Sequence, residues 1–339
     1  MIASSFACAR EVFHFCHRRF RQLIEFVSSF ATNEKVCLHS PGRRYAPVAC
    51  KLWFITLLQR KINGCICVVA GYVDLMSLRA DWTELTDFAL ALGDASAERI
   101  LPFFRQANRI DVKPGAVWDP VTEADRAGEE VVRLMIEARF PDHGILGEEF
   151  GLKESRSGFT WVLDPIDGTR AFICGMPTWA TLIGLNYQDR PVLGVMNQPY
   201  VGETFYANPL GAWSRHRGHV TRLAVRPPRP LAEAILTTTA PELYRSDEEK
   251  AVLRRMTEKT RLTRYGGDAY FFCVMAAGQV DIAMDARMET YDIAPLLPII
   301  EGAGGVVSTW TRGDAAKGGN VIAASSHGLL EEALAVIAG

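Results

Sequence analysis

The chain lacks an excess of basic residues and has no apolar run long enough to cross a membrane. It has 37 Lys and Arg against 39 Asp and Glu, a net charge of −2 over 339 residues. This balance does not support a nucleic-acid-binding surface. The apolar run 65–73 is short, and Lys51, Arg60 and Lys61 interrupt the segment before it. We therefore expect no nucleic acid and no membrane among the partners.

Cysteines are scarce outside the first part of the chain. Six of the eight lie within residues 1–75, and only Cys174 and Cys273 follow. Two isolated cysteines provide neither a disulfide framework nor the ligand spacing of a zinc site, which is typical of a reducing compartment. We expect a cytoplasmic protein, or an organellar one if residues 1–75 are a transit peptide.

Residues 1–75 differ from the rest of the chain in charge. They carry ten Lys and Arg and four acids, a net charge of +6, which leaves −8 for the remaining residues. Three explanations are open: an upstream translation artefact with the true start at Met76, an organellar transit peptide, and an irregular extension. We assign this segment no function.

Helical spacing of apolar residues begins directly after this segment. Leu85, Ala89 and Leu92 predict a helix that starts near Asp81. A second helix is predicted over residues 123–138, with one apolar face formed by Ala127, Val131, Leu134 and Ala138.

From residue 150 onward, apolar strand-like runs alternate with helices. Strands are predicted at 160–163, 181–185, 191–196, 280–284 and 306–307, and helices at 271–277 and 293–301. This alternation predicts a layered α/β architecture. A Pro- and Arg-rich hinge at 226–230 divides the body into an N-terminal half, 76–225, and a C-terminal half, 226–339.

The nonapeptide 161–169 concentrates groups that bind a cation and a phosphate. Asp164, Asp167, the carbonyl of Ile166 and the hydroxyl of Thr169 lie on what we expect to be a tight turn after an apolar strand. Such oxygen ligands are those that Mg²⁺ prefers. Gly168 and Thr169 open a predicted helix, so their N–H groups can face a phosphate.

Three further acidic clusters, at 119–125, 147–151 and 291–295, accompany the nonapeptide. Each has a structural alternative: Thr122 and Asp125 match a helix capping box, Asp292 can be a helix N-cap, and Glu148 can be a solvated loop charge. Hydrolysis of a phosphate monoester requires such convergent acids, because metal ions must neutralise the phosphoryl oxygens and activate a water. The order of the four clusters favours this function.

These motifs resemble those of the inositol monophosphatase-like, magnesium-dependent phosphatases. The family motifs GEE, D-P-[IL]-D-G-T and [WY]-D-x-A followed by E-A-G-G correspond to residues 147–149, 164–169 and 291–305. The resemblance covers roughly residues 80–338. It implies an αβαβα sandwich of the inositol monophosphatase/fructose-bisphosphatase type, an α/β fold with an α+β half followed by an α/β half.

The resemblance also implies roles for individual residues. It implies two or three Mg²⁺ ions per site, a small phosphorylated metabolite as substrate, and a homodimer as a candidate assembly, since homologues are often dimers. Asp125 and Thr169 would orient the attacking water, with Glu148 also acting in catalysis, and the N–H groups of Gly168 and Thr169 would bind the phosphate. The implied metal ligands are Glu148, Asp164, the Ile166 carbonyl, Asp167 and Asp292.

The segment 263–270 bears on the choice of phosphate ester. It carries Asp268 and Tyr270 where inositol phosphatases usually have small neutral residues, and so resembles the histidinol-phosphate phosphatase branch. An acid and an aromatic ring suit the ammonium and imidazole groups of histidinol phosphate. Asp285 and Arg264 complete the predicted substrate contacts. A turn at Gly266-Gly267-Asp268 with Tyr270 in the core is the structural alternative.

The expected activity is therefore histidinol-phosphatase in histidine biosynthesis. Alternatives are an inositol-1-monophosphatase or a related sugar- or nucleotide-phosphate phosphatase, and a catalytically silent member of the family. Acids at every expected position argue against the silent member, since four carboxylates would repel one another without a divalent cation. Residues 287–290 depart from the pattern that we expect in the histidinol-phosphate branch.

Overall fold

The computed structural model describes residues 80–106, 110–112 and 120–339. The predictions made for residues 1–75 lie outside this part. Among the helices that the model describes, none combines the length and the apolar character that a membrane crossing requires.

The larger sheet has eight strands in the order β10-β9-β8-β7-β6-β5-β3-β4. Strands β3 and β5 pair in parallel, and the other neighbouring pairs are antiparallel. The predicted strands 160–163, 181–185 and 191–196 are confirmed within β5, β6 and β7. The strands are β3 (Gly144–Gly147), β4 (Gly151–Lys153), β5 (Phe159–Asp167), β6 (Ala180–Tyr187), β7 (Arg190–Gln198), β8 (Glu203–Asn208), β9 (Gly211–His216) and β10 (His219–Arg222).

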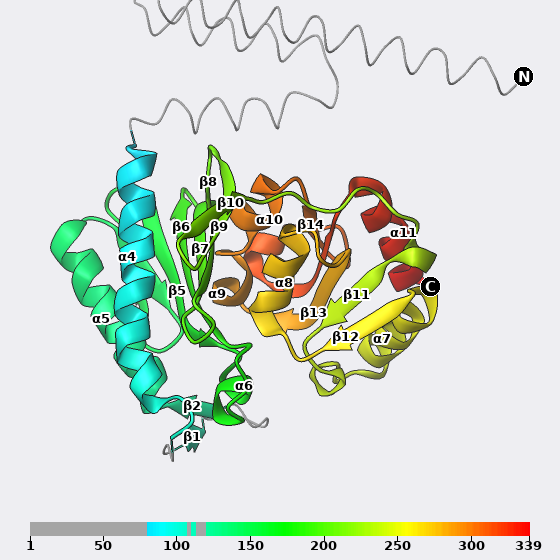
Figure 1. The fold of residues 1–339 in the computed structure, drawn as a ribbon, viewed down its shortest axis with the longest axis horizontal. Helices are drawn as coiled ribbons and strands as arrows, with labels where there is room; N and C mark the ends of the chain where they lie inside the picture. The colour runs from blue at the N-terminus through cyan, green and yellow to red at the C-terminus, as the bar shows by residue number, and fades with distance from the viewer. Residues whose placement is uncertain (1–79, 107–109, 113–119) are drawn as a thin grey trace, which may run out of the picture. The chain divides into compact units, whose positions relative to one another are not determined.

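Helices α4 (Trp82–Ile100) and α5 (Glu123–Arg139) cover one face of this sheet (Figure 1). Asp81 caps α4 by accepting hydrogen bonds from the N–H groups of Thr83 and Glu84, which confirms the predicted start. Leu85 and Leu92 are buried against the sheet in one hydrophobic cluster. The first predicted helix therefore packs as its periodicity indicates.

The second predicted helix is confirmed, but the face predicted from its apolar residues is not the one that is buried. Leu134 is 62% exposed, whereas Asp125 and Glu129 are each only 1% exposed. The buried side of α5 therefore includes two carboxylates, and a search for apolar periodicity does not register charged residues as a buried face.

Three short helices, α8 (Asp268–Ala276), α9 (Thr290–Ile293) and α10 (Leu297–Gly302), lie between the two sheets (Figure 1). The single helix predicted over residues 293–301 is wrong, because the chain forms α9 and α10 with a break between them. Pro295 and Pro298 have no N–H group to donate, so a continuous helical ladder cannot form here. The helix predicted at 271–277 is confirmed as α8, which begins three residues earlier and ends at Ala276.

The smaller sheet has five strands in the order β12-β11-β13-β15-β14. Helices α7 (Asp247–Lys259) and α11 (His327–Ala338) pack on its outer face. The predicted strands 280–284 and 306–307 fall at β13 and β14. The strands are β11 (Ile235–Thr238), β12 (Leu262–Tyr265), β13 (Ile282–Met288), β14 (Val306–Thr309) and β15 (Gly319–Ala324).

The layers along the described body follow the order α, β, α, β, α (Figure 1). This confirms the predicted αβαβα class. The larger sheet ends at Arg222 and the smaller begins at Ile235, and the proposed border between residues 225 and 226 stays a prediction. The remaining elements are β1 (Ile110–Val112), β2 (Pro120–Thr122), α6 (Thr169–Ile173) and the 3₁₀ turns Leu101–Phe103, Leu231–Glu233, Pro241–Leu243 and Ala315–Lys317.

Candidate functional site

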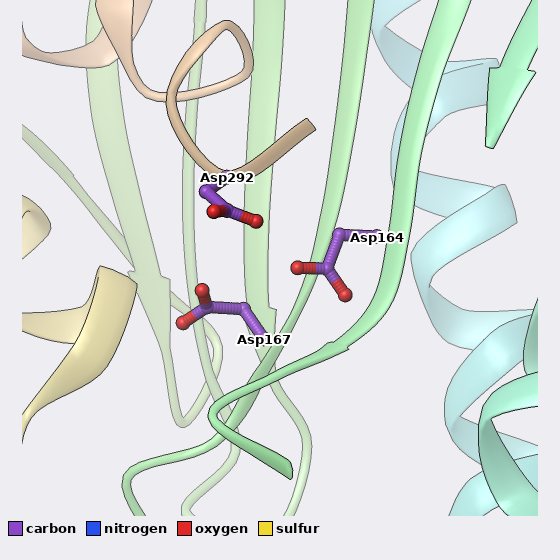
Figure 2. Close-up of side chains that lie close together, drawn as sticks. All are labelled: Asp164, Asp167 and Asp292. Atoms are coloured by element: carbon purple, nitrogen blue, oxygen red, sulfur yellow. The ribbon is translucent and has the colours of Figure 1, made fainter. Parts of the chain in front are cut away.

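Three carboxylates from two distant parts of the chain converge between the larger sheet and the helices that lie between the two sheets, α8, α9 and α10. Asp164 and Asp167 extend from β5, and Asp292 extends from α9 (Figure 2). One oxygen of each carboxylate lies within 4.8 Å of the other two. The structure thus brings together three of the predicted metal ligands.

An irregularity in β5 places Asp164 and Asp167 together. Residues three apart in a regular strand point to opposite faces. The pairing of β5 with β6 shifts register between Asp164 and Asp167, which is the mark of a bulge, and the carbonyl of Pro165 accepts a hydrogen bond from the Thr181 hydroxyl at 2.8 Å. The expectation of a tight turn is therefore wrong, because the strand continues to Asp167 and bends within the motif.

Asp292 is held by a capping box rather than acting as an N-cap. It is the third residue of α9, and its Oδ2 atom accepts a hydrogen bond from the N–H of Glu289 at 2.7 Å. The N-cap alternative is therefore wrong, because α9 starts before Asp292 and ends before Pro295. The hydrogen bond leaves the other carboxylate oxygen of Asp292 for the cluster.

Burial and mutual repulsion make the charged state of this cluster costly. Burial raises the pKa of Asp164 well above its usual range, and the charges of Glu148, Asp167 and Asp292 raise it further. Burial likewise raises the pKa of Asp167, with added repulsion from Asp268 and Asp292. Burial and nearby acids raise the pKa of Asp292 to about 8.

The donor set fits a hard divalent cation. The Oδ1 atom of Asp164 is buried and accepts no hydrogen bond from the described residues. A buried carboxylate oxygen normally has a partner. Because three acidic side chains surround the same point and oxygen is the ligand type that Mg²⁺ prefers, a bound Mg²⁺ would satisfy Asp164 and remove the repulsion.

Glu148 borders this cluster from the turn after β3. Its N–H donates to the carbonyl of Leu163 at 3.2 Å, and the proximity of its side chain to Asp164 contributes to the raised pKa of that carboxyl. It lies outside the group of three whose oxygens are all within 4.8 Å of one another. Its role as a metal ligand stays a prediction, as do the roles of the three aspartates and of the Ile166 carbonyl.

Asp125 lies near Glu148 and Glu149 and also caps α5. Its Oδ2 atom accepts from the Thr122 N–H at 2.7 Å and from the Thr122 hydroxyl at 2.6 Å, so the capping-box interpretation is confirmed. Burial raises the pKa of Asp125 to about 7, and the charges of Glu149 and Glu148 add to the effect. A carboxylate that titrates near neutrality can exchange a proton with a water during catalysis.

Thr169 begins the five-residue helix α6, and Gly168 is its N-cap. The Thr169 hydroxyl donates to the carbonyl of Ile166 at 3.1 Å, and among the described residues no hydrogen bond joins Thr169 to Asp125. Gly168 has a φ of 81°, a conformation that glycine adopts without strain. The predicted phosphate contacts of Gly168 and Thr169, and the joint action of Thr169 and Asp125, stay predictions.

Asp268 lies against the start of α6. A Cβ atom on Gly168 would be 2.9 Å from the carboxyl carbon of Asp268. Asp268 has a φ of 45°, a left-handed conformation that is rare for a non-glycine residue and frequent at functional sites. Burial raises its pKa to about 7, with a further contribution from Asp285, while the charge of Arg170 opposes the rise.

Asp285 is near Asp268 but is already occupied by hydrogen bonds. Its carboxylate accepts from the Thr238 hydroxyl and from the N–H and the hydroxyl of Thr239, each at 2.8 Å. Burial nevertheless raises its pKa to about 6. In contrast, Asp268 accepts no hydrogen bond from the described residues.

Tyr270 and Arg264 are the other two predicted substrate residues. Among the described residues, neither side chain makes a hydrogen bond or ion pair with the acidic cluster. The ring of Tyr270 packs edge-on against Phe205, and its hydroxyl donates to Glu203 on β8. This agrees with the core-packing alternative for Tyr270. Arg264 is exposed on the edge strand β12, and its side chain makes no hydrogen bond or ion pair with the described residues. Substrate contacts through Tyr270 and Arg264 stay untested predictions.

The sequence analysis missed Glu129. This residue is buried on α5, four positions after Asp125, and its carboxylate accepts hydrogen bonds from the turn that carries Glu148. The available signal was its spacing: Asp125, Glu129 and Arg133 recur every four residues and therefore lie on one side of the helix.

Residues 81–338 match the model of the inositol monophosphatase family. The chain belongs to this family. A bifunctional phosphatase IMPL2, chloroplastic, from Arabidopsis thaliana is 39% identical over 239 residues, which are 68% of this chain and 66% of that protein. A histidinol-phosphatase from Mycobacterium tuberculosis is 34% identical, covering 72% of this chain and 94% of that protein. The solved structure of an inositol monophosphatase from Zymomonas mobilis matches with a TM-score of 0.68 and 37% identity, covering 77% of this chain and 100% of that one.

Membership confirms the resemblance that the three motifs indicated. The family consists of phosphatases that act on small phosphorylated substrates and that in general depend on Mg²⁺. The chain is therefore a phosphatase of the inositol monophosphatase family, and its cluster of three aspartates could bind the metal.

Proposed function

We propose that this phosphatase is a Mg²⁺-dependent histidinol-phosphatase of histidine biosynthesis, which hydrolyses L-histidinol phosphate to L-histidinol and phosphate. The observation that carries the proposal is the carboxylate of Asp268, which has no hydrogen-bond donor among the described residues and lies against Gly168. Asp268 is half-buried and has Asp285 as an acidic neighbour, so a nearby cation would favour its charged form.

The chemistry of histidinol phosphate matches this placement. Its ammonium group is on the carbon next to the one that carries the phosphate ester, so an ammonium site must adjoin the phosphate site. Asp268 adjoins Gly168, whose N–H we expect to bind the phosphate. An ammonium beside Asp268 would favour its charged form and provide a charge-assisted hydrogen bond.

The remaining site residues have roles in the same reaction. Glu148, Asp164, Asp167, Asp292 and the carbonyl of Ile166 would hold two or three Mg²⁺ ions. Bound Mg²⁺ supplies charge neutralisation at the phosphoryl oxygens and lowers the pKa of a water. Asp125 and Thr169 would orient that water in line with the ester bond, and the N–H groups of Gly168 and Thr169 would hold the phosphate.

The second candidate is an inositol-1-monophosphatase or a related sugar- or nucleotide-phosphate phosphatase. The likeness to the Zymomonas mobilis inositol monophosphatase over the whole of that chain favours it. The two candidates differ in charge, because inositol phosphate has no ammonium group for Asp268 to bind. The names of the relatives support both activities.

The test is a comparison of phosphate release from L-histidinol phosphate and from inositol 1-phosphate, side by side, with and without Mg²⁺. We expect release to require Mg²⁺ and kcat/KM to be higher for histidinol phosphate. A preference for inositol 1-phosphate would overturn the proposed substrate and leave the phosphatase activity standing.

We place the enzyme in the cytoplasm, with an organelle as the alternative because one relative is named chloroplastic.

A further inference from the structure

Glu129 is a buried acid close to the proposed metal site. Among the described residues it makes no hydrogen bond to the three clustered aspartates, but it accepts hydrogen bonds from the turn that carries Glu148. It is 1% exposed, on the side of α5 that faces the larger sheet. Its Oε2 atom accepts from the N–H of Glu149 at 2.8 Å, and its Oε1 atom accepts from the N–H of Phe150 at 3.2 Å. Two consecutive N–H groups of the turn after β3 therefore point at one carboxylate.

The residue at the end of β3 leaves room for this carboxylate. A Cβ atom on Gly147 would overlap the side chain of Glu129. Any residue larger than glycine would thus displace either the turn or Glu129. Gly147 therefore has a structural role, because its lack of a side chain allows the Glu129 carboxylate to approach the backbone of the turn.

Arg133 holds the other end of the same turn. Its Nε atom pairs with Glu129 Oε1 at 2.7 Å, and the Arg133 side chain also donates to the carbonyl of Gly151. Its guanidinium lies 5.9 Å from the centre of the Phe150 ring. Glu129 and Arg133, one helical turn apart, therefore hold the backbone of this turn at residues 149, 150 and 151.

We propose that Glu129 is a positioning residue for the metal site, and that it acts by fixing the turn from which Glu148 reaches Asp164. This inference rests on the proposed role of Glu148 as a metal ligand. Groups that orient metal ligands through hydrogen bonds typically change metal affinity by about 10- to 100-fold when they are mutated. A Gln at position 129 keeps the size of the side chain but replaces one accepting oxygen with a donor, which faces an N–H of the turn.

The test is calorimetric titration of the full-length protein with MgCl₂ in the absence of substrate. We expect Glu129→Gln to raise the Kd for Mg²⁺ by about 10-fold or more. The matched control is Glu249→Gln in the other half. Glu249 is also buried, accepts from the N–H groups of Arg245 and Ser246, and pairs with Arg287 at 3.0 Å. We expect this control to keep the Kd within about twofold of wild type, since it does not contact the turn at 148–150.

Activity and a second variant separate positioning from a loss of fold. Saturating Mg²⁺ should restore most of kcat in Glu129→Gln, because the ligands themselves remain. If Glu129→Gln does not fold, Arg133→Lys provides the test, since a lysine cannot bind both Glu129 and the Gly151 carbonyl in the same geometry. Wild-type affinity for Mg²⁺ in whichever variant folds would overturn the positioning role alone. Absence of Mg²⁺ binding by the wild-type protein would instead overturn the proposed metal site, and the positioning role with it.

Discussion

The carboxylate of Asp167 accepts a hydrogen bond from the backbone N–H of Ala269 at 2.7 Å. The bond joins β5 of the larger sheet to the first turn of α8, across 102 positions of sequence. Asp167 also belongs to the acidic cluster, and Asp268 precedes Ala269. The proposed metal site and the proposed ammonium site are therefore connected through a single side chain.

Asp167→Asn should abolish turnover while leaving the protein folded. The amide oxygen can still accept the hydrogen bond from Ala269, but the variant lacks the negative charge that a cation requires. We expect kcat/KM to fall by about 100-fold or more, because even the partners of metal ligands are worth 10- to 100-fold. Phosphate release and circular dichroism provide the measurement. Activity near the wild-type value would remove Asp167 from the metal site.

Addition of Mg²⁺ should raise the melting temperature of the wild-type protein. A ligand at 100 times its Kd stabilises the folded state by about 2.7 kcal/mol, which corresponds to roughly 5 °C for a domain of this size. Asp164→Asn should lose this response and most of the activity. Its melting temperature without Mg²⁺ should at least equal that of the wild type, because the substitution relieves the repulsion among the acids. An equal response to Mg²⁺ in both proteins would contradict the site.

Asp268→Ala should impair the hydrolysis of histidinol phosphate far more than that of glycerol phosphate. A charge-assisted hydrogen bond contributes about 1.5–3 kcal/mol, so we expect a loss of about 10- to 100-fold for the cationic substrate. Glycerol phosphate has no ammonium group and serves as the internal control. Equal losses for the two esters would refute recognition of the ammonium by Asp268.

The order of the acidic motifs predicted the chemistry. A metal site restricts which residue types can serve as ligands more than it restricts how the chain folds around them. Asp164, Asp167 and Asp292 were identified from sequence and lie together in the structure. The local path of the chain was less predictable. The bulge in β5 depends on how the strand pairs with β6, and the break between α9 and α10 depends on two prolines that a periodicity search treats as part of one helix.

The buried face of α5 shows a different limit. Glutamate is usually an exposed residue type, and the burial of Glu129 becomes favourable through the ion pair to Arg133 and through hydrogen bonds from the N–H groups of Glu149 and Phe150. The two N–H groups are 20 and 21 positions away in the sequence. Periodicity within a helix cannot report a partner in another element, so it indicated a face that includes Leu134 and did not indicate the burial of Glu129.

Gly194→Ala should destabilise the protein strongly. A Cβ atom on Gly194 in β7 would overlap the carbonyl oxygen of Pro295, which follows α9 and Asp292. Backbone cannot move aside as a flexible side chain can, so we expect a loss of about 1–3 kcal/mol or more. Activity should fall as well, because α9 carries Asp292. Urea denaturation and phosphate release measure the two effects.

The control for this substitution is Gly328→Ala in the first turn of α11. A Cβ atom there meets no atom within 4 Å, so we expect the stability to be unchanged or slightly higher. If Gly194→Ala proved as stable as Gly328→Ala, the close approach of Pro295 to β7 would not constrain the fold.

His143 is a titratable group outside the metal site. It is half-buried, and its Nδ1 atom accepts a hydrogen bond from the indole N–H of Trp161 at 3.1 Å. Its ring stacks on Phe140 at 4.6 Å between centroids. Burial lowers the pKa of His143 below its usual value, and Lys153 adds to the decrease while Asp142 opposes it. A protonated ring could no longer accept from Trp161.

The sign of the resulting pH dependence follows from this lowered pKa. Above about pH 6.5 the imidazole is neutral in both the folded and the unfolded chain, so it imposes no penalty. As the pH falls below that value, the unfolded chain binds the proton first, and the folded state loses stability until the pH reaches the folded pKa. We therefore expect the melting temperature of the wild type to fall more between pH 7.5 and 5.5 than that of His143→Gln, which retains an acceptor but does not titrate. Parallel decreases in the two proteins would show that other groups determine the acid sensitivity of the fold.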